Sequence, residues 1–131
     1  MIGLDTNVIV RYVIRDNPDQ ARLASTLINS LSADNRAFLP LVVMVELAWV
    51  LRSSYQLQRQ EIAILLDGLL RTKELLIEQA ELVGQALYRY ANSPADFADC
   101  LIERCATTAG CDLVFTFDRT ASVAAGMRLL S

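Results

Sequence analysis

Short apolar runs alternate with longer amphipathic stretches along the whole of this 131-residue chain. The runs that resemble buried strands lie at residues 1–4, 38–39, 75–77 and 113–116, and the run 127–130 ends the chain. Helical periodicity fills the intervals, at residues 8–14, 42–55, 58–71 and 80–91, in stretches that begin at Pro18 and Pro94, and in a last small helix. Apolar strands that alternate with helices are typical of a parallel sheet covered by helices on both faces. The sequence therefore predicts one α/β domain over residues 1–131.

Local signals indicate where two of these helices begin. Asn17 and Pro18 predict a capped start, and the helix continues with leucines at four-residue spacing, at positions 23, 27 and 31. Ser93 and Pro94 predict a second capped start, for a helix that ends near Gly110.

Cysteine and histidine usage restricts the chemistry. Cys100, Cys105 and Cys111 form no C-x-x-C pair, so we expect a reduced, cytoplasmic protein without a disulfide framework or a zinc knuckle. The chain has no histidine, which excludes Ser-His-Asp and Cys-His catalysis and histidine-ligated metals. The longest apolar stretch, residues 38–51, contains Pro40 and Glu46, so we expect no membrane span. The first residues reach Asp5 without a basic lead-in, so we expect no export signal.

Two aspartates directly follow predicted strands. Asp5 ends the first strand region, and Asp118 follows the strand near residue 116. Ligands of parallel α/β sheets bind beyond the carboxyl ends of the strands, which makes both residues site candidates. The alternative is that each aspartate caps the helix that follows it.

Glu46 is the only charged residue between positions 38 and 51. Its neighbours at helical spacing are Val42, Val43, Trp49 and Val50, so we expect a buried carboxylate. An ionised carboxylate in such a place needs a partner, either a metal ion or, as the alternative, an arginine.

The helix that begins near Pro94 carries three acids. A helical wheel places the core face at residues 97, 98, 101, 102, 105 and 109. Asp96 and Glu103 lie opposite this face, and Asp99 lies on its flank. The wheel therefore predicts two solvated acids and one, Asp99, that reaches over the core edge.

Net charge supports a shared cation site. The chain has a net charge of −3, and without Asp5, Glu46, Asp99 and Asp118 it would carry +1. A cluster of these carboxylates would repel itself without a cation, and carboxylate oxygens suit Mg²⁺ or Mn²⁺.

Four short motifs, in order, resemble those of a PIN domain. They are Ile-Gly-Leu-Asp-Thr-Asn-Val-Ile at 2–9, Val-Glu-Leu at 45–47, Asp-Phe-Ala-Asp-Cys-Leu-Ile at 96–102 and Thr-Phe-Asp at 116–118. The chain's length and its Asp-Phe-Ala-Asp spacing are similar to those of VapC-type toxins of toxin–antitoxin systems. Glu103 and Cys105 depart from the small apolar residues common in the family after Asp99, but the departure leaves the acids intact.

The resemblance implies a three-layer αβα fold with a short, mostly parallel central sheet of about five strands. It implies that Asp5, Glu46, Asp99 and Asp118 are the catalytic, metal-binding acids. Supporting candidates are Asn7, Thr116, Asp96 and Arg119, the last as a phosphate contact.

The implied activity is Mg²⁺- or Mn²⁺-dependent endonucleolytic cleavage of RNA by activated water, which leaves 5′-phosphate and 3′-hydroxyl ends. The expected partners are an RNA substrate, a cognate antitoxin and a second copy of the chain in a homodimer.

Other function classes fit less well or remain open. Haloacid-dehalogenase-like phosphatases need Asp-x-Asp where this chain has Asp5-Thr6-Asn7, and receiver domains need a late lysine where the only lysine is Lys73. The isolated glycines exclude phosphate-binding loops. A non-catalytic PIN-fold binding or regulatory module, and a PIN nuclease that processes RNA outside a toxin–antitoxin system, remain alternatives.

Overall fold

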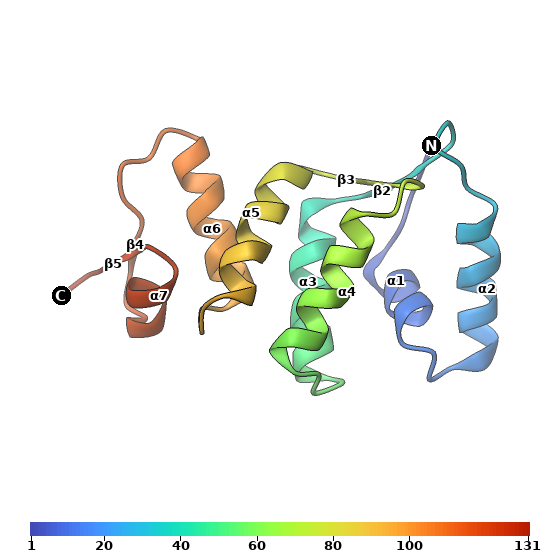
Figure 1. The fold of residues 1–131 in the computed structure, drawn as a ribbon, viewed down its shortest axis with the longest axis horizontal. Helices are drawn as coiled ribbons and strands as arrows, with labels where there is room; N and C mark the ends of the chain where they lie inside the picture. The colour runs from blue at the N-terminus through green and yellow to red at the C-terminus, as the bar shows by residue number, and fades with distance from the viewer. The chain divides into compact units, whose positions relative to one another are not determined.

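The computed structural model describes residues 1–131, which form two compact units, Met1–Ala80 and Glu81–Ser131 (Figure 1). None of the helices combines the length and the apolar character needed to cross a membrane.

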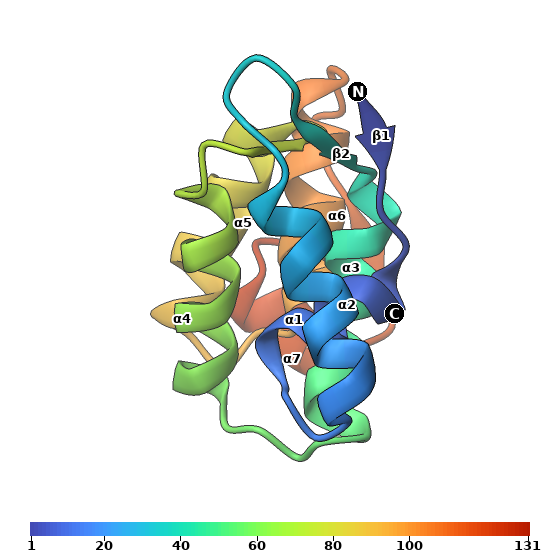
Figure 2. The same ribbon diagram turned by 90° about the vertical axis from the view of Figure 1, so that its right-hand side faces the viewer.

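The first unit contains a three-stranded parallel sheet. Its strands are β1 (Ile2–Gly3), β2 (Ala37–Leu39) and β3 (Leu75–Ile77), hydrogen-bonded in the order β1-β2-β3. Ala37 pairs with Ile2 on one side and with Leu75 on the other. Figure 2 shows β1 beside β2. The register places the carboxyl ends of all three strands at one edge of the sheet.

Four helices connect these strands. They are α1 (Thr6–Val13), α2 (Pro18–Asn29), α3 (Leu41–Ser53) and α4 (Arg59–Leu70), and α1 packs on α2 while α3 packs on α4 (Figure 1). Asn17 caps α2 as predicted, because its side chain accepts a hydrogen bond from the Gln20 amide at 3.1 Å. The leucines of α2 do not form its buried face: the helix buries Ala21, Ala24 and Ile28, whereas Leu23 is 67% exposed.

The second unit contains three helices and one parallel strand pair. Its elements are α5 (Ala80–Ala91), α6 (Phe97–Thr108), β4 (Phe115–Thr116), α7 (Arg119–Ala124) and β5 (Arg128–Leu129), with Phe115 paired to Arg128. Tyr90 of α5 meets Phe97 of α6 edge-to-face, with ring centroids 5.9 Å apart. This contact anchors the start of α6 against α5.

The start of α6 differs from the prediction. The helix begins at Phe97 after an extended Asp96, not at Pro94. The Ser93 hydroxyl instead donates to the Arg89 carbonyl at 2.7 Å and so satisfies the end of α5. Because a serine hydroxyl can serve a helix end as well as a helix start, the sequence signal was ambiguous.

The α/β class predicted from the sequence is confirmed, with seven helices and parallel strands throughout. The predicted number of strands is also found, but they form a set of three and a separate pair instead of one sheet. β1, β4 and β5 have only two residues each, so each forms few ladder hydrogen bonds.

Candidate functional site

Asp5 lies two residues beyond the end of β1 and caps α1. Its Oδ1 accepts a hydrogen bond from the Thr6 amide at 2.7 Å. The predicted alternative of helix capping is therefore correct for this residue. Capping uses one carboxylate oxygen, and the side chain is exposed, so Oδ2 remains open to a ligand.

Glu46 lies on α3 and is held by a hydroxyl from α1. The Thr6 hydroxyl, which is buried, donates a hydrogen bond to Glu46 Oε1. The prediction that Glu46 is buried is wrong, and its alternative, a buried ion pair with an arginine, is not formed. The reason is that the apolar stretch is not buried all round: Val42 and Trp49, its neighbours one turn away, are 69% and 67% exposed.

Asp5 and Glu46 open into one cleft of the first unit, which has a volume of about 390 Å³. The cleft is lined by Asp5, Thr6, Asn7, Val10, Arg11, Glu46, Val50, Ser54 and Tyr55. The guanidinium of Arg11 is the only positive charge in this lining. Arg11 Nη1 donates to the Tyr55 hydroxyl at 3.0 Å and to Asp16 Oδ1 at 3.2 Å, which ties the guanidinium to the segments that follow α3 and α1.

Asn7, predicted as a supporting residue, lines this cleft, and so do three residues that sequence reasoning missed, Thr6, Arg11 and Tyr55. A signal existed for Arg11, because it lies one helical turn after Asn7 and therefore on the same face of α1. Nothing in the sequence near Tyr55 connects it with the first helix.

Asp99 lies in the first turn of α6 and is partly buried, as the helical wheel predicted. No hydrogen bond or ion pair involves its side chain. Burial raises the pKa of the Asp99 carboxyl, and the negative charges of Asp96 and Asp118 raise it further. Asp96 is exposed at the N-cap position, where its side chain forms no capping hydrogen bond. The second unit thus has an acidic group with no neutralising cation.

Asp118 lies two residues beyond the end of β4 and caps α7. Its Oδ1 accepts from the Ala121 amide at 3.1 Å, which again leaves Oδ2 free. The Thr116 hydroxyl accepts from the Asp118 amide at 3.0 Å, so Thr116 shapes the turn that presents the carboxylate. Arg119 begins α7 and is exposed.

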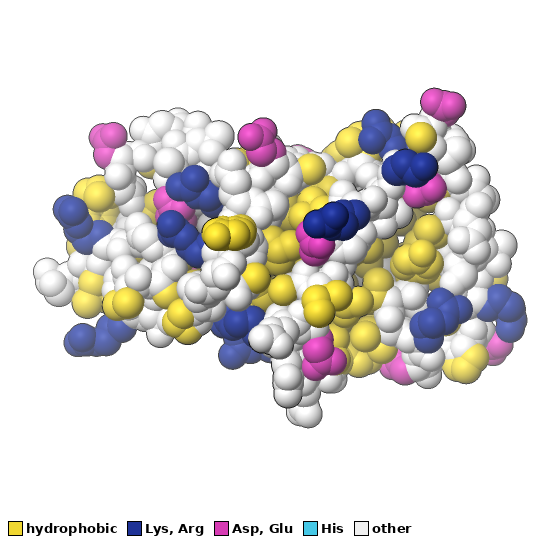
Figure 3. Space-filling view, in the orientation of Figure 1, with side chains coloured by type: hydrophobic (Ala, Val, Ile, Leu, Met, Phe, Trp, Pro, Cys, Tyr) yellow, Lys and Arg dark blue, Asp and Glu magenta, His cyan; other side chains and the backbone are white.

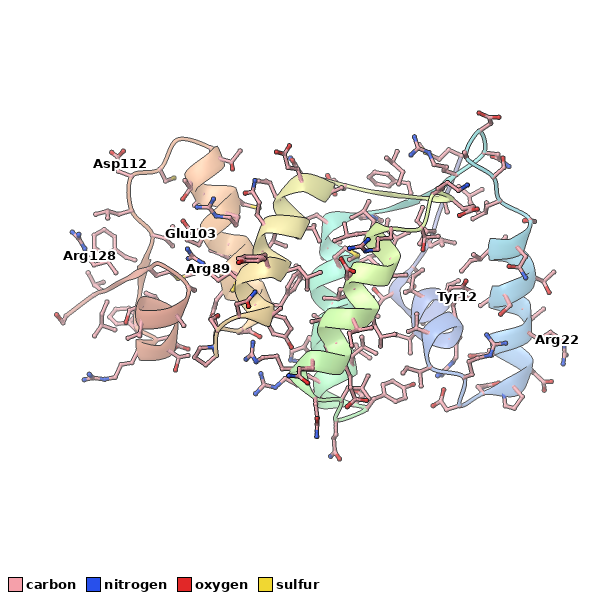
Figure 4. All side chains as sticks on the ribbon, viewed as in Figure 1. Tyr12, Arg22, Arg89, Glu103, Asp112 and Arg128 are labelled. Atoms are coloured by element: carbon pink, nitrogen blue, oxygen red, sulfur yellow. The ribbon has the colours of Figure 1, made fainter.

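Glu103 is buried, contrary to the helical wheel, and is only 8% exposed. Arg104 donates two hydrogen bonds to its carboxylate, at 2.7 and 3.0 Å, and the Thr107 hydroxyl donates a third at 2.6 Å. Arg89 Nη1 of α5 lies 3.7 Å from Glu103 Oε1, and Figure 4 labels Arg89 and Glu103 on neighbouring helices. The hydrogen bonds from Arg104 lower the pKa of Glu103, although burial acts in the opposite direction. Glu103 is therefore a structural ion-pair residue.

The four predicted acids are divided equally between the units, with Asp5 and Glu46 in the first and Asp99 and Asp118 in the second. Neither unit by itself gathers three or more acidic or thiol side chains into a group that could hold a metal ion.

Comparison with protein families gives one result. The model of the PIN domain matches residues 2–126, a range that includes all four acids. The comparison with curated proteins finds no match.

Proposed function

Since the chain belongs to the PIN domain family, whose members are generally metal-dependent nucleases, we propose that it is a Mg²⁺- or Mn²⁺-dependent endoribonuclease. We further propose that it is the toxin of a VapBC-type toxin–antitoxin pair. The choice of RNA and the toxin role rest on the motifs at 2–9, 45–47, 96–102 and 116–118, which resemble those of VapC-type toxins.

The observation that carries the nuclease proposal is the place of the two strand-end aspartates. Asp5 and Asp118 each follow a parallel strand by two residues and each caps the next helix with a single oxygen. Such places beyond the carboxyl ends of parallel strands are where α/β proteins bind their ligands. The second oxygen of each carboxylate remains available there.

The donor atoms suit a hard divalent cation. Thr6 occupies only Oε1 of Glu46, and the Asp99 carboxylate has no hydrogen-bond donor or cation. Together with Asp5 of the first unit and Asp118 of the second, these residues offer oxygen ligands alone, the ligand type that Mg²⁺ and Mn²⁺ prefer. When bound, such an ion supplies Lewis-acid activation of water and neutralises charge at the scissile phosphate.

The remaining residues of the site orient the acids or offer contacts to the substrate. Thr6 fixes the Glu46 carboxylate through its hydroxyl, and Thr116 fixes the turn before Asp118. Arg11 offers a fixed guanidinium beside Asp5 and Glu46, which suits one oxygen of a substrate phosphate. Asn7 offers an amide in the same cleft, and Arg119 offers a second guanidinium next to Asp118. Attack by water leaves a 5′-phosphate and a 3′-hydroxyl.

The proposed partners are a cognate antitoxin and a second copy of the chain. Exposed apolar side chains of the first unit support this part of the proposal, among them Leu23, Trp49 and Ile64 at 67%, 67% and 71% exposure. Large apolar residues on a surface are typical of protein interfaces when they form a patch.

The test is cleavage of RNA by the purified chain, with sequencing of the product ends. We expect EDTA to abolish cleavage, Mg²⁺ or Mn²⁺ to restore it, and Ca²⁺ not to restore it, because Ca²⁺ coordinates more loosely. The matched control is Asp5→Asn, which removes one ligand. Robust cleavage by the EDTA-treated protein, or by Asp5→Asn, would contradict the metal mechanism.

The toxin role is tested separately by induced expression. We expect wild type to arrest growth and Asp5→Asn, expressed at the same level, not to do so. Equal growth of both cultures, together with RNA cleavage in vitro, would favour an RNA-processing nuclease instead. Binding of RNA without any cleavage would favour the non-catalytic module.

A further inference from the structure

A second hollow lies in the Glu81–Ser131 unit, and none of the four acids of the proposed site lines it. This hollow, the α5–α6 groove, has a volume of about 910 Å³. Its lining includes Glu81, Gly84, Tyr88, Arg89, Asn92 and Arg104. Arg104 follows Asp99 by five residues on α6, which places it about 140° around the helix. The groove therefore lies on a different face of α6 from Asp99.

Three charged side chains line the groove, the two arginines Arg89 and Arg104 and the acid Glu81. Glu103 alone faces two guanidinium groups, those of Arg104 and Arg89. Its two oxygens already accept hydrogen bonds from Arg104 and Thr107. Arg89 Nη1 is shielded from solvent and has no hydrogen-bond partner. One positive charge is thus left without a hydrogen-bonded counterion. Figure 3 shows basic side chains on either side of an acidic one over this part of the unit.

Arg89 lies between Glu103 and Gly126. Gly126 has a positive φ of 77°, and a Cβ atom there would lie 2.5 Å from Arg89 Nη1, so the guanidinium rests directly against this glycine. The Arg89 side chain is 38% exposed, and its exposed part lines the groove. A guanidinium in this place offers planar N–H donors that suit the oxygens of an anion.

Two further features indicate the kind of anion. Tyr88 is 74% exposed beside Arg89 and offers a flat aromatic face. Gly84 lies inside α5, and a Cβ there would meet no atom within 4 Å. Because alanine is favoured over glycine inside a helix, nothing in the helix itself requires glycine at this position. The missing side chain keeps the groove open next to the aromatic ring.

We propose that the α5–α6 groove binds a phosphate group of a single-stranded nucleic acid, with a neighbouring base stacked on Tyr88. This inference rests on the proposed function, because it gives the nuclease a second contact with its substrate. Guanidinium groups beside an exposed aromatic ring are the combination with which proteins bind single strands without reading their sequence. Glu81, at the rim, opposes the phosphate and limits the affinity.

The test uses fluorescence anisotropy of a fluorescein-labelled RNA decamer with the full chain in EDTA, so that binding is measured without cleavage. Gly84→Leu fills the groove, and Gly68→Leu is its matched control, since Gly68 is also a helical glycine with open space around it. We expect Gly84→Leu and Tyr88→Ala to weaken binding about fivefold or more, because stacking on an aromatic ring contributes at least that factor. Gly68→Leu should bind like wild type, and Glu81→Gln should bind more tightly.

Salt dependence provides an independent measurement. Arg89→Gln should reduce the slope of log affinity against log salt concentration by about 0.7, the value for one phosphate contact of a single strand. Because this change also disturbs Glu103, its melting curve is recorded alongside, and binding is measured well below the midpoint.

Several outcomes would overturn the proposal. One is that Gly84→Leu and Gly68→Leu bind the RNA decamer with equal affinity, and another is that wild type does not bind the decamer. A third is that a poly-glutamate peptide of the same charge displaces the decamer as well as unlabelled RNA does. The last result would assign the groove to an acidic protein. Cleavage in Mn²⁺ is scored separately, so loss of the nuclease proposal and loss of the groove proposal are distinguishable.

Discussion

Two carboxylates on α6, one helical turn apart, lie in opposite electrostatic environments. Asp99 is partly buried among acids and has no cation beside it, and the pKa of its carboxyl is raised. Glu103 is more deeply buried, yet the hydrogen bonds from Arg104 lower the pKa of its carboxyl. The same helix thus contains one carboxylate whose charge is balanced by the protein and one whose charge is not.

The difference shows how a structural acid is distinguished from a functional one. A buried charge needs a partner, and for Glu103 the fold supplies Arg104, Arg89 and Thr107. For Asp99 the fold supplies Asp96 and Asp118, which increase the electrostatic penalty. Such an arrangement is stabilised by a cation from outside, in agreement with the proposed metal site.

The largest expected effect separates the two acids by activity. Asp99→Asn should reduce the cleavage rate by roughly 100-fold or more, about 2.7 kcal/mol of transition-state stabilisation, because it removes a proposed metal ligand. Glu103→Gln should leave the rate per folded molecule near that of wild type. Initial rates on one RNA substrate measure both. Equal damage from Asp96→Asn and Asp99→Asn would show that the wrong acid of the pair has been assigned to the metal.

The second expected effect distinguishes Glu103 from Asp99 by the contribution of each to folding stability. Glu103→Gln should lower the free energy of unfolding by about 2–3 kcal/mol, because it weakens charged hydrogen bonds and leaves Arg104 and Arg89 without a counterion. Chemical denaturation measures this difference. Asp112→Asn, an exposed change in the same unit, is the control and should stay within about 0.5 kcal/mol. A Glu103→Gln protein as stable as the control would remove Glu103 from its structural role.

The third effect is a response to metal. Mn²⁺ at ten times its Kd should stabilise wild type by about 1.4 kcal/mol, since a ligand that binds only the folded state adds RT ln(1 + [L]/Kd). Asp99→Asn should respond much less and Glu103→Gln as much as wild type. Thermal melting with and without Mn²⁺ measures the response. An equal shift in Asp99→Asn would place the metal elsewhere.

The smallest expected effect is that the contributions of Asp99 and Glu103 to folding stability change with pH in opposite directions. It is measured in EDTA. A raised pKa in the folded state means that ionised Asp99 destabilises the fold at neutral pH, and this penalty disappears as the pH falls below about 4. The stability gained by Asp99→Asn over wild type should therefore be present at pH 7 and absent near pH 3.5. For Glu103, with its lowered pKa, the contribution is present above its unfolded pKa and is lost as the pH falls through the folded value. Parallel stability curves for wild type and both variants would contradict this contrast.

Local features of the fold could be predicted from the sequence because they depend on neighbouring residues. The apolar run at β3 and the helical period of α5 give these elements with the bounds found in the structure. Asn17 caps its helix, and Asp5 and Asp118 lie beyond strand ends, because strand, cap and helix are contiguous in sequence. The same contiguous signals predicted the two candidate site residues that follow strands, Asp5 and Asp118.

Burial of the charged residues was decided by the tertiary structure. The sequence predicts a buried Glu46 and an exposed Glu103, and the structure has them the other way round. A helical wheel shows only which residues share a face, whereas burial depends on what packs against that face. Arg89, which reaches Glu103 from another helix, and Thr6, which reaches Glu46 across 40 residues, are contacts of this kind. The sequence alone determined which acids the chain has and the order of most of its helices and strands, although not the start of α6. Only the tertiary structure determined which acids have their charge balanced by distant side chains, because that balance depends on distances in space that residue spacing does not encode.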